Sequence, residues 1–439
     1  MADVVAPKNV LFITYYWPPS GGAGVQRSLK FIKYLPEFGI RPIVLTVDPQ
    51  KATYPVLDPS LCDEVGPDVN VFFTSSFEPL RLLNRFSGGK AKIPHGGFTN
   101  QRKDSFTQRL LRFIRGNFFI PDARVGWIRH ATARAERLIR EYKIDTVVIS
   151  SPPHSSQLIG LALKKKNDAI RWIADLRDPW TDIYYYEEMH HFPFARKKDA
   201  GFEKEVLENC DVAVVVSDHL KELFLTKSTK LSSEKFKVIP NGFDATDFSN
   251  TIVSAKDSFL ITYVGTIADN YEPEVFFDSV NRFRNDFKDA RIRIRFVGSP
   301  SGNLASLLEK YGLLAATEFI PQVSHAEAVG HMNVSSALLL LIPNTRHDKL
   351  ILTGKLFEYL GSGVPIVGLG PEDGDAALIL QQSGTGRLFD RRHGEQLTEH
   401  IKSLYLRWLE NGDMRHGKDV SMFERKKLTG TLADIIKKN

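Results

Sequence analysis

The sequence predicts an α/β protein made of two Rossmann-like, doubly wound domains. Short apolar runs typical of buried strands recur along the chain. Many are followed by a glycine-rich or polar turn and then by apolar residues at helical spacing. A polar stretch over residues 244–257 separates two such series. We therefore expect an N-terminal domain at 1–243 and a C-terminal domain at 258–419, with a cleft between them.

Composition and charge narrow the classes of function. The formal net charge of +6 is compatible with anionic substrates or an anionic membrane face, but it is too small to indicate nucleic acid. The two cysteines, Cys62 and Cys210, are far apart in sequence, so we expect no disulfide framework, no thiolate metal site and a reducing compartment. The chain begins without the pattern of a signal peptide, and no apolar run has the length to span a bilayer. A cytoplasmic protein is the expectation.

The first series opens with the apolar run Val10–Thr14, a predicted buried strand. A loop containing Gly21 and Gly22 follows, and then a helix at about 25–35. Glycines at the carboxyl end of a strand let the backbone approach a ligand. Their spacing is not Gly-x-Gly-x-x-Gly, so a dinucleotide fingerprint is absent. Further strands are expected at 42–47 and 71–74.

A basic and aromatic region interrupts the alternation of strands and helices. Over residues 82–119 the only acid is Asp104, and a helix is predicted from Gln108 to Phe119. One interpretation is an interfacial helix attracted to anionic lipid. The other is a surface insertion with a solvated basic face. The residues concerned are Arg85, Phe86, Lys90, Lys92, Phe98, Arg102, Lys103, Phe106, Arg109, Arg112, Phe113, Arg115, Phe118 and Phe119.

The alternation resumes with a helix at 127–141 and a strand at 144–150. His154 follows that strand, near a helix start, where it could donate a hydrogen bond to a substrate or simply cap the helix. The next strand runs into Asp175, Arg177 and Asp178. Such a cluster is usually an internal ion-pair network, and at a strand end it is also a plausible acceptor or sugar pocket. Strands at 212–217 and 237–244 complete this half, with a helix opening at Asp218.

The second series repeats the pattern. A strand at 260–264 leads into Gly265 and Thr266, and a helix begins near Glu274. Strands are expected at 292–297, 337–342 and 366–369, with a helix at 324–332 and a last short strand after the turn at Gly384. An amphipathic helix carrying Leu428, Leu432 and Ile435 ends the chain.

The segment from Lys349 to Pro365 joins two of these apolar runs. Residues 355–360 form a predicted helix, and Thr353 and Gly354 precede it. The first amides of such a helix can bind an anion, to which Lys355 adds a positive charge. Glu358 lies about one turn on and can accept hydrogen bonds from sugar hydroxyls. The alternative is that Gly354 only opens a turn and Glu358 is solvated.

Several of these motifs together resemble the bacterial GT-B glycosyltransferases of family 4. The resemblance covers most of the chain, and its most specific parts are the Pro-Asn-Gly-Phe-Asp and Lys-Leu-Phe-Glu-Tyr-Leu stretches. Other segments resemble the branch that acts in cell-surface polysaccharide synthesis. The residues that carry the likeness are Gly21-Gly22, Ile120–Trp127, Ser151–Pro153, Asp175–Trp180, Val238–Asp244, Tyr263–Thr266 and Lys355–Ile366.

The resemblance implies a retaining transferase that uses a nucleotide-diphosphate sugar and requires no metal or other cofactor. It implies that Glu358 binds the nucleotide ribose and that amides near Gly354 and Lys355 hold the diphosphate. The backbone from Ile320 to Val323 would face the base. The acceptor would be a glycan or a lipid-linked sugar, and the C-terminal helix, residues 420–439, would pack back on the N-terminal domain.

The remaining site residues follow from the same likeness. Gly22, with Gly21, would approach the phosphates from the first domain, and Gly265 and Thr266 open the second half. His154 lies near the position of a family histidine that contacts the transferred sugar. With Lys355 and Asp178 it completes the candidate catalytic set.

Two departures from the family pattern affect the donor site. Leu350 stands where the family often has a glutamate that touches the donor sugar. Basic residues that the family often places after the glycine of the first strand are absent after Gly265. We hypothesise that Lys355, Lys349 or Arg346 supplies the missing charge.

Two other classes of function remain compatible with the sequence. One is another enzyme on the same scaffold, a nucleotide-sugar epimerase or a phosphorylase. The other is a catalytically silent subunit that binds a nucleotide sugar or a lipid surface, an alternative suggested by Leu350.

Overall fold

The computed structural model describes residues 6–78, 106–248, 257–299, 302–415 and 417–438. The chain divides into two compact units. Of the described residues, the first unit contains 6–78, 106–240 and 425–438, and the second contains 241–248, 257–299, 302–415 and 417–424. The boundary between these two units falls after Pro240. Of the basic and aromatic region at 82–119, residues 82–105 lie outside the described ranges.

The first unit contains a seven-stranded parallel sheet within the described ranges. In spatial order its strands are β3 (Asn70–Thr74), β2 (Ile40–Val47), β1 (Lys8–Thr14), β4 (Thr146–Ser151), β5 (Arg171–Leu176), β6 (Val212–Val215) and β7 (Phe236–Val238). The prediction of a strand over 237–244 is wrong beyond Val238. Pro240 has no N–H group with which to continue the ladder.

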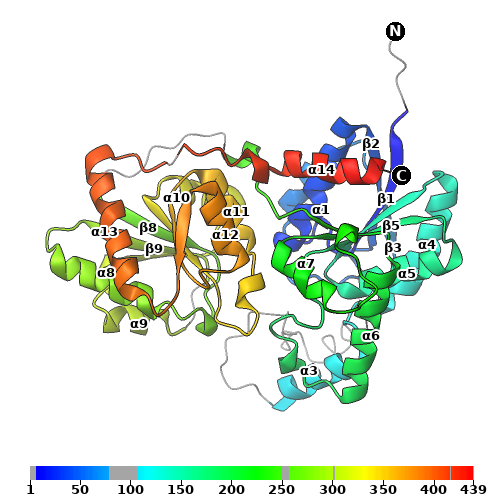
Figure 1. Cartoon of the computed structure of the whole chain (residues 1–439), viewed down its shortest axis with the longest axis horizontal. Helices are drawn as coiled ribbons and strands as arrows, with labels where there is room; N and C mark the ends of the chain where they lie inside the picture. Colours follow the sequence, from blue (N-terminus) through cyan, green and yellow to red (C-terminus); the bar gives the residue numbers. More distant parts are fainter. Residues whose placement is uncertain (1–5, 79–105, 249–256, 300–301, 416, 439) are drawn as a thin grey trace, which may run out of the picture. The chain divides into compact units, whose positions relative to one another are not determined.

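Helices cover both faces of this sheet (Figure 1). Helices α1 and α14 lie side by side on one face, where Leu29, Ile32, Leu432 and Ile436 share a core with alternate strand residues. Helices α4 and α5 pack on the other face. The helices of the unit are α1 (Ala23–Tyr34), α3 (Phe106–Phe118), α4 (Ile128–Glu141), α5 (Gln157–Lys166), α6 (Pro193–Asn209), α7 (Asp218–Leu225) and α14 (Arg425–Lys437).

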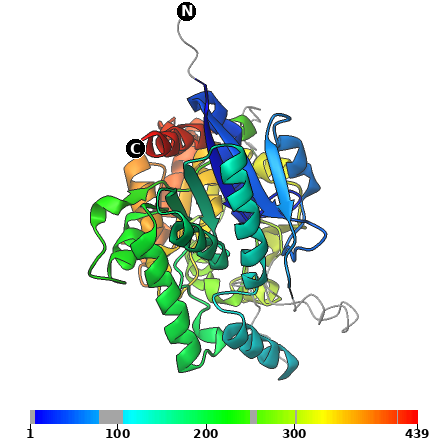
Figure 2. The same cartoon turned by 90° about the vertical axis from the view of Figure 1, so that its right-hand side faces the viewer.

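Helix α3 packs beside the first turns of α6, at the edge of the first unit (Figure 2). The ring of Phe113 contacts that of Phe192 edge-on, with centroids 5.0 Å apart. The side chain of Asn117 accepts a hydrogen bond from the Phe192 amide at 2.6 Å and donates one to the His190 carbonyl at 3.2 Å. The predicted helix at 108–119 therefore exists, and one face of it packs against the protein.

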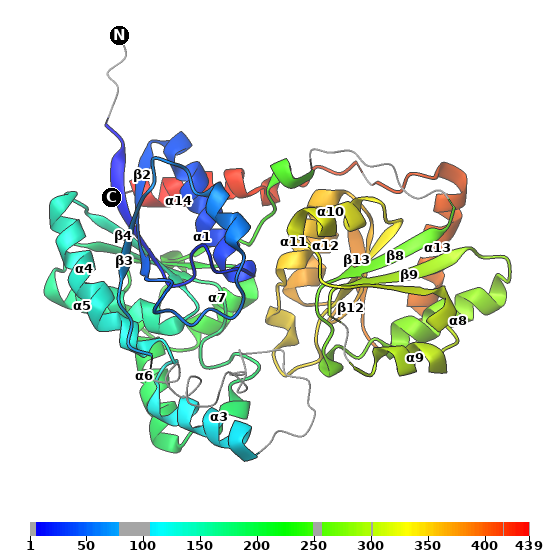
Figure 3. The ribbon, with the colours of Figure 1, turned by 180° about the vertical axis from the view of Figure 1, so that it is seen from behind.

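The second unit contains a six-stranded parallel sheet in the part of the chain that is described. Its strands lie in the order β10 (Thr317–Ile320), β9 (Ile292–Val297), β8 (Phe259–Val264), β11 (Ala337–Leu341), β12 (Ile366–Leu369) and β13 (Gly386–Phe389). Figure 3 shows this sheet between two helix layers. The helices are α8 (Glu274–Asp286), α9 (Leu304–Lys310), α10 (His325–Asn333), α11 (Gly354–Ser362), α12 (Asp375–Ser383) and α13 (Gly394–Asn411).

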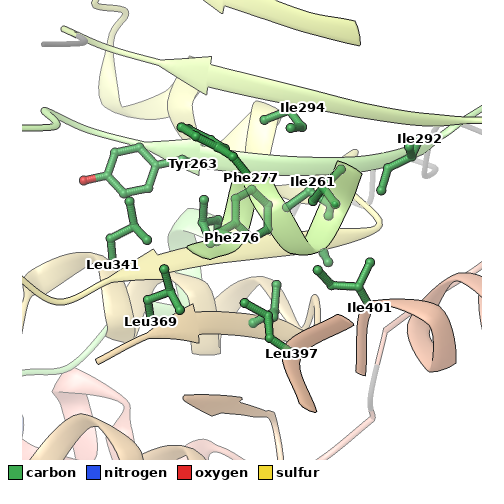
Figure 4. Close-up of a cluster of buried hydrophobic side chains, with 14 of the residues drawn as sticks. Ile261, Tyr263, Phe276, Phe277, Ile292, Ile294, Leu341, Leu369, Leu397 and Ile401 are labelled. Carbon is green, nitrogen blue, oxygen red and sulfur yellow. The ribbon is translucent and has the colours of Figure 1, made fainter. Parts of the chain in front are cut away.

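Alternate strand residues divide the core of the second unit in two. Leu339 and Leu341 of β11 face α8 and α13, whereas Leu338 and Leu340 face α11 and α12. Figure 4 shows part of the first cluster. There the Tyr263 ring lies at one end and its hydroxyl points away from the apolar side chains. This hydroxyl is at the carboxyl end of β8, where open sheets bind ligands.

The two sheets thus have the doubly wound α/β architecture that the sequence predicts. In each, the strand order reverses direction between two neighbouring strands, β1 and β4 in the first unit and β8 and β11 in the second. Ligands of such sheets bind above this switch point, at the carboxyl ends of the strands.

Candidate functional site

In the first unit, the glycine loop leads from β1 to the start of α1. Gly22 is the N-cap of the helix, with φ +88°, and it is exposed. No side chain caps the first turn, and that turn carries no acid. The first amides of a helix have no partner within the helix, so this end of α1 favours an anion. Gly21 is confined instead, because a Cβ there would lie 2.9 Å from that of Asp58.

A buried ion pair holds α1 to the sheet beneath this loop. Arg27 contacts Asp175 of β5 at 2.9 Å, and both side chains are almost fully buried. Asp175 also accepts a hydrogen bond from Ser150 at 2.7 Å. Arg177, which lies between Asp175 and Asp178 in sequence, does not pair with Asp175 in this way. It donates hydrogen bonds to the carbonyls of Gly24, Ser151 and Pro152. It thereby ties the glycine loop to the loop after β4.

His154 lies in that loop after β4, at the switch point of the first sheet. The residue is 9% exposed, and its ring stacks on Trp180, with centroids 4.8 Å apart and an interplanar angle of 14°. Both ring nitrogens are buried, and the ring interacts with the backbone of Pro179. Burial lowers the pKa of His154 to about 4, an effect that the nearby carboxylate of Asp122 opposes. The imidazole is therefore neutral at pH 7 and able to donate one hydrogen bond and accept another.

Asp178 follows Arg177 in the chain and is partly exposed. Burial raises the pKa of its carboxyl group, whereas Arg177 lowers it. The negative charge of Asp178 also raises the pKa of Tyr185, a smaller effect than the burial of that phenol. Asp178 is thus close to polar groups at the carboxyl edge of the sheet.

In the second unit, Lys355 of α11 reaches the turn after β8. Its ammonium group donates to the Tyr263 hydroxyl at 2.6 Å, and that hydroxyl donates to the Thr266 carbonyl at 2.8 Å. Gly265 has φ +121°, and a Cβ there would lie 2.9 Å from the Lys355 nitrogen. The absence of a side chain at Gly265 leaves room for the lysine. Burial lowers the pKa of Lys355 to about 7, an effect that Glu358 opposes.

The N-terminus of α11 stands beside this lysine. Thr353 is the N-cap, its side chain makes no cap hydrogen bond, and the first turn carries no acid. Thr353 and Gly354 are both partly exposed. The first amides of the helix and the Lys355 ammonium group therefore form a positive site at the switch point of the second sheet.

Glu358 lies about one turn further along α11. Its side chain is 27% exposed, and its Oε1 lies 3.9 Å from Nδ1 of His325 at the start of α10. The other ring nitrogen of His325 lies 3.2 Å from Asp247. His325 is not among the predicted site residues, because nothing in the local pattern of α10 indicates that it adjoins α11.

The other predicted binding residues surround the same edge of the second sheet. The Thr266 side chain is exposed, and Val323 lies partly exposed in the turn between β10 and α10. Lys349 forms an ion pair with Asp373 on the surface, so its charge is already matched there. Arg346 is exposed. Of the three basic residues hypothesised, Lys355 is therefore the one in contact with the Gly265 turn.

Three contacts near the site were not foreseen: the pairing of Arg27 with Asp175, the stacking of Trp180 on His154, and the packing of Lys355 on Tyr263. In each, the partners are far apart in sequence. The sequence contains one signal of these contacts, which is an acid at the end of an apolar strand. A buried carboxylate requires a positively charged or donor partner, but its identity depends on the fold.

The described ranges contain no group of three or more His, Cys, Asp or Glu side chains that could hold a metal ion. Within those ranges, no helix is both long enough and apolar enough to cross a membrane.

Comparison with known proteins confirms the family resemblance. Residues 90–247 match the model of Glycosyltransferase Family 4. No curated protein matches the sequence. Among solved structures, the lipopolysaccharide outer core galactosyltransferase WaaB is 13% identical, with a TM-score of 0.59 and coverage of 98% of this chain and 100% of that chain.

Two further structures are similar over their whole length. WaaG, a glycosyltransferase involved in lipopolysaccharide biosynthesis, is 16% identical, with a TM-score of 0.55 and coverage of 98% and 100%. A trehalose-6-phosphate protein from E. coli bound with UDP-2-fluoro glucose is 11% identical, with a TM-score of 0.56 and coverage of 98% and 96%. At these identities the likeness establishes the fold, which is GT-B.

Proposed function

We propose that this chain, which has the GT-B fold and matches glycosyltransferase family 4 over residues 90–247, transfers a sugar from a nucleotide-diphosphate sugar to a glycan or lipid-linked acceptor. Polysaccharide or lipopolysaccharide biosynthesis is the proposed setting. The observation that carries the proposal is the placing of the Lys355 ammonium group beside Gly265 and the uncapped start of α11.

Each part of the donor has a candidate partner. The diphosphate would accept hydrogen bonds from the first amides of α11 and from Lys355, which together stabilise negative charge. Glu358 would accept hydrogen bonds from the ribose hydroxyls, and the backbone near Val323 would contact the base. In the first unit, the first amides of α1 after Gly22 are a second candidate for binding an anion.

In the proposed reaction the bond between the anomeric carbon and the diphosphate oxygen breaks, and the acceptor hydroxyl attacks from the same face. Its proton passes to the departing diphosphate, so the configuration at the anomeric carbon is retained. Amides and a lysine that already point at the leaving group stabilise its developing charge, and loss of one such donor costs about a hundredfold in rate. His154 would bind a hydroxyl of the transferred sugar through its neutral ring, and Asp178 would bind the acceptor.

A panel of nucleotide sugars tests the proposal. The protein is incubated with each, with and without a chelator, and release of the nucleoside diphosphate and the anomeric configuration of any product are measured. We expect slow hydrolysis of one donor, transfer when an acceptor is added, retention, and no effect of the chelator. Absence of turnover and of any thermal shift with every donor would refute the transferase proposal.

The same panel separates the alternatives. An epimerase would change the sugar while leaving it attached to the nucleotide, and it would need carboxylates around the sugar ring. A phosphorylase of the pyridoxal phosphate type would show the absorbance band of its cofactor. A silent subunit would bind a nucleotide sugar, with a raised melting temperature, and release no product.

We also propose that the first unit rests on the inner face of an anionic membrane. The α3–α6 surface, defined here by Phe118, Phe192 and Phe194, exposes large aromatic side chains. Arg109 of α3 and Lys197 of α6 are exposed on the same two helices. Aromatic and basic residues together favour the interface of an anionic bilayer.

Cosedimentation with vesicles tests the membrane contact. We expect binding to phosphatidylglycerol vesicles, weaker binding at high salt, and little binding to phosphatidylcholine. Phe194→Ser should reduce binding, whereas Phe73→Ser, which changes an exposed phenylalanine of β3, should not. Equal loss in the two variants would refute the assignment of this surface.

A further inference from the structure

A buried carboxylate in the first unit joins two stacked pairs of rings. Asp199 of α6 is 2% exposed and accepts hydrogen bonds from the indole N–H of Trp180 at 2.7 Å and from the hydroxyl of Tyr186 at 2.9 Å. Trp180 stacks on His154. Tyr186 stacks on His191, with centroids 4.3 Å apart and an interplanar angle of 21°.

Burial of the Asp199 side chain is unfavourable, because the carboxylate loses its hydration. In the described part of the chain it makes no ion pair, so two neutral donors alone compensate for its lost hydration. Burial raises its pKa to about 7, the bonds from Trp180 and Tyr186 lower it, and the acids Asp122 and Glu203 raise it further. An apolar residue at this position would avoid that loss of hydration. What the carboxylate does provide is a fixed plane and position for the indole.

The orientation of His154 depends on that indole. The ring of His154 interacts with one short segment, because it stacks on Trp180 and its polar edge meets the backbone of Pro179, the residue before Trp180. The face of Trp180 supports one side of the ring. A rotation of Trp180 would therefore turn His154.

We propose that Asp199 is a positioning residue for His154: by accepting the Trp180 indole N–H it fixes the ring on which His154 stacks, and so fixes the orientation of the His154 ring in the candidate site. The inference rests on the proposed function for the part that concerns the substrate. The mechanical part concerns the protein alone and can be measured without any substrate.

The test uses three changes in the full-length chain. Trp180→Phe keeps a ring for His154 and removes the N–H. Asp199→Leu removes the acceptor. Glu203→Gln is the matched control, since Glu203 lies one turn along α6, is equally buried, and bonds Thr181 and Lys227 rather than Trp180. The ring of His154 is observed by NMR in protein labelled at histidine, with His154→Gln to identify its signals.

We expect Trp180→Phe and Asp199→Leu to shift the His154 ring signals and Glu203→Gln to leave them in place. In the transfer reaction, we expect kcat to fall roughly tenfold in the first two variants, with KM for the donor little changed, because a small misplacement of a reacting group affects the rate more than binding. Unchanged His154 signals in folded Trp180→Phe would overturn the inference, as would an equal shift in Glu203→Gln. If Asp199→Leu does not fold, Trp180→Phe decides.

Failure of the proposed function gives a different result. If no nucleotide sugar is turned over by the wild-type protein, the transferase assignment fails, while the NMR comparison still decides whether Asp199 fixes the ring of His154.

Discussion

The ammonium group of Lys355 lies 4.2 Å from the centre of the Tyr263 ring and donates a 2.6 Å hydrogen bond to the hydroxyl of that ring. The aromatic face and the hydroxyl together hold a cationic side chain whose surroundings are largely apolar. The lysine thus occupies a fixed position beside Gly265. We propose that this lysine neutralises part of the charge of a bound diphosphate.

The first prediction concerns affinity for a nucleoside diphosphate. Lys355→Met should weaken binding by at least about tenfold, because a charge-assisted hydrogen bond contributes roughly 1.5–3 kcal/mol. Tyr263→Phe should weaken it less, since the ammonium group remains and loses only its anchor. Lys349→Met is the control, because Lys349 is paired with Asp373. Isothermal titration measures all three, and equal affinities in Lys355→Met and the wild type would exclude Lys355 from the site.

The second prediction concerns stability against pH. The pKa of Lys355 is about 7 in the folded protein and 10.5 for a lysine side chain in water, as in the unfolded chain. Below pH 7 both states carry the proton, so the cost of burying the charge is fully present. Between about pH 7 and 10.5 the folded state binds fewer protons than the unfolded state, so stability rises with pH.

Comparison with Lys355→Met isolates this effect. The free energy of unfolding, measured by urea at pH values from 6 to 10, should rise in the wild type relative to the variant across that window. A constant difference between the two proteins would mean that Lys355 keeps an ordinary pKa.

The fold could be predicted from the sequence because its signals are local. The apolar runs Val10–Thr14 and Ala337–Leu341 are too short for helices and are bounded by turn residues, and both are central strands. Helices α6, α9, α12 and α13 were not named. In α6, the buried Asp199 and Glu203 interrupt the apolar stripe that marks a helix face.

The candidate site could be predicted only in part, for a different reason. The start of α11 and the turn at Gly265 have local signatures, namely small residues where a strand meets a helix. Their proximity follows from the strand order β8–β11, which the sequence does not reveal. The partners of Lys355 and His154 are set by packing between segments far apart in the chain, and residue type alone does not specify them.

The third prediction concerns the ion pair beneath the glycine loop. Arg27→Met should destabilise the first unit by about 3–5 kcal/mol, because it leaves the buried carboxylate of Asp175 without its cation. Adding Asp175→Asn should recover part of this loss, since the amide is neutral and can still accept from Ser150. Urea denaturation of the single and double variants measures both effects.

A surface pair provides the comparison. Lys166→Met removes the partner of Glu136 in an ion pair at 2.5 Å whose lysine is 63% exposed. It should cost no more than about 1 kcal/mol. Similar costs for Arg27→Met and Lys166→Met would contradict the role assigned to the buried pair.

The last prediction concerns the ribose. If Glu358 accepts hydrogen bonds from the ribose hydroxyls, the wild-type protein should bind a ribonucleoside diphosphate more tightly than its 2′-deoxy analogue, by roughly five- to a hundredfold. In Glu358→Ala the preference should disappear. The ribonucleotide loses the acceptor of its 2′-hydroxyl, whereas the deoxy analogue has no 2′-hydroxyl and so loses less affinity. Glu410→Ala, at an exposed carboxylate of α13, should retain the full preference.

The ratio of the two affinities within each variant is the measure, since it cancels any general loss of binding caused by releasing His325 from Glu358. A ratio in Glu358→Ala equal to that of the wild type would move the ribose away from α11.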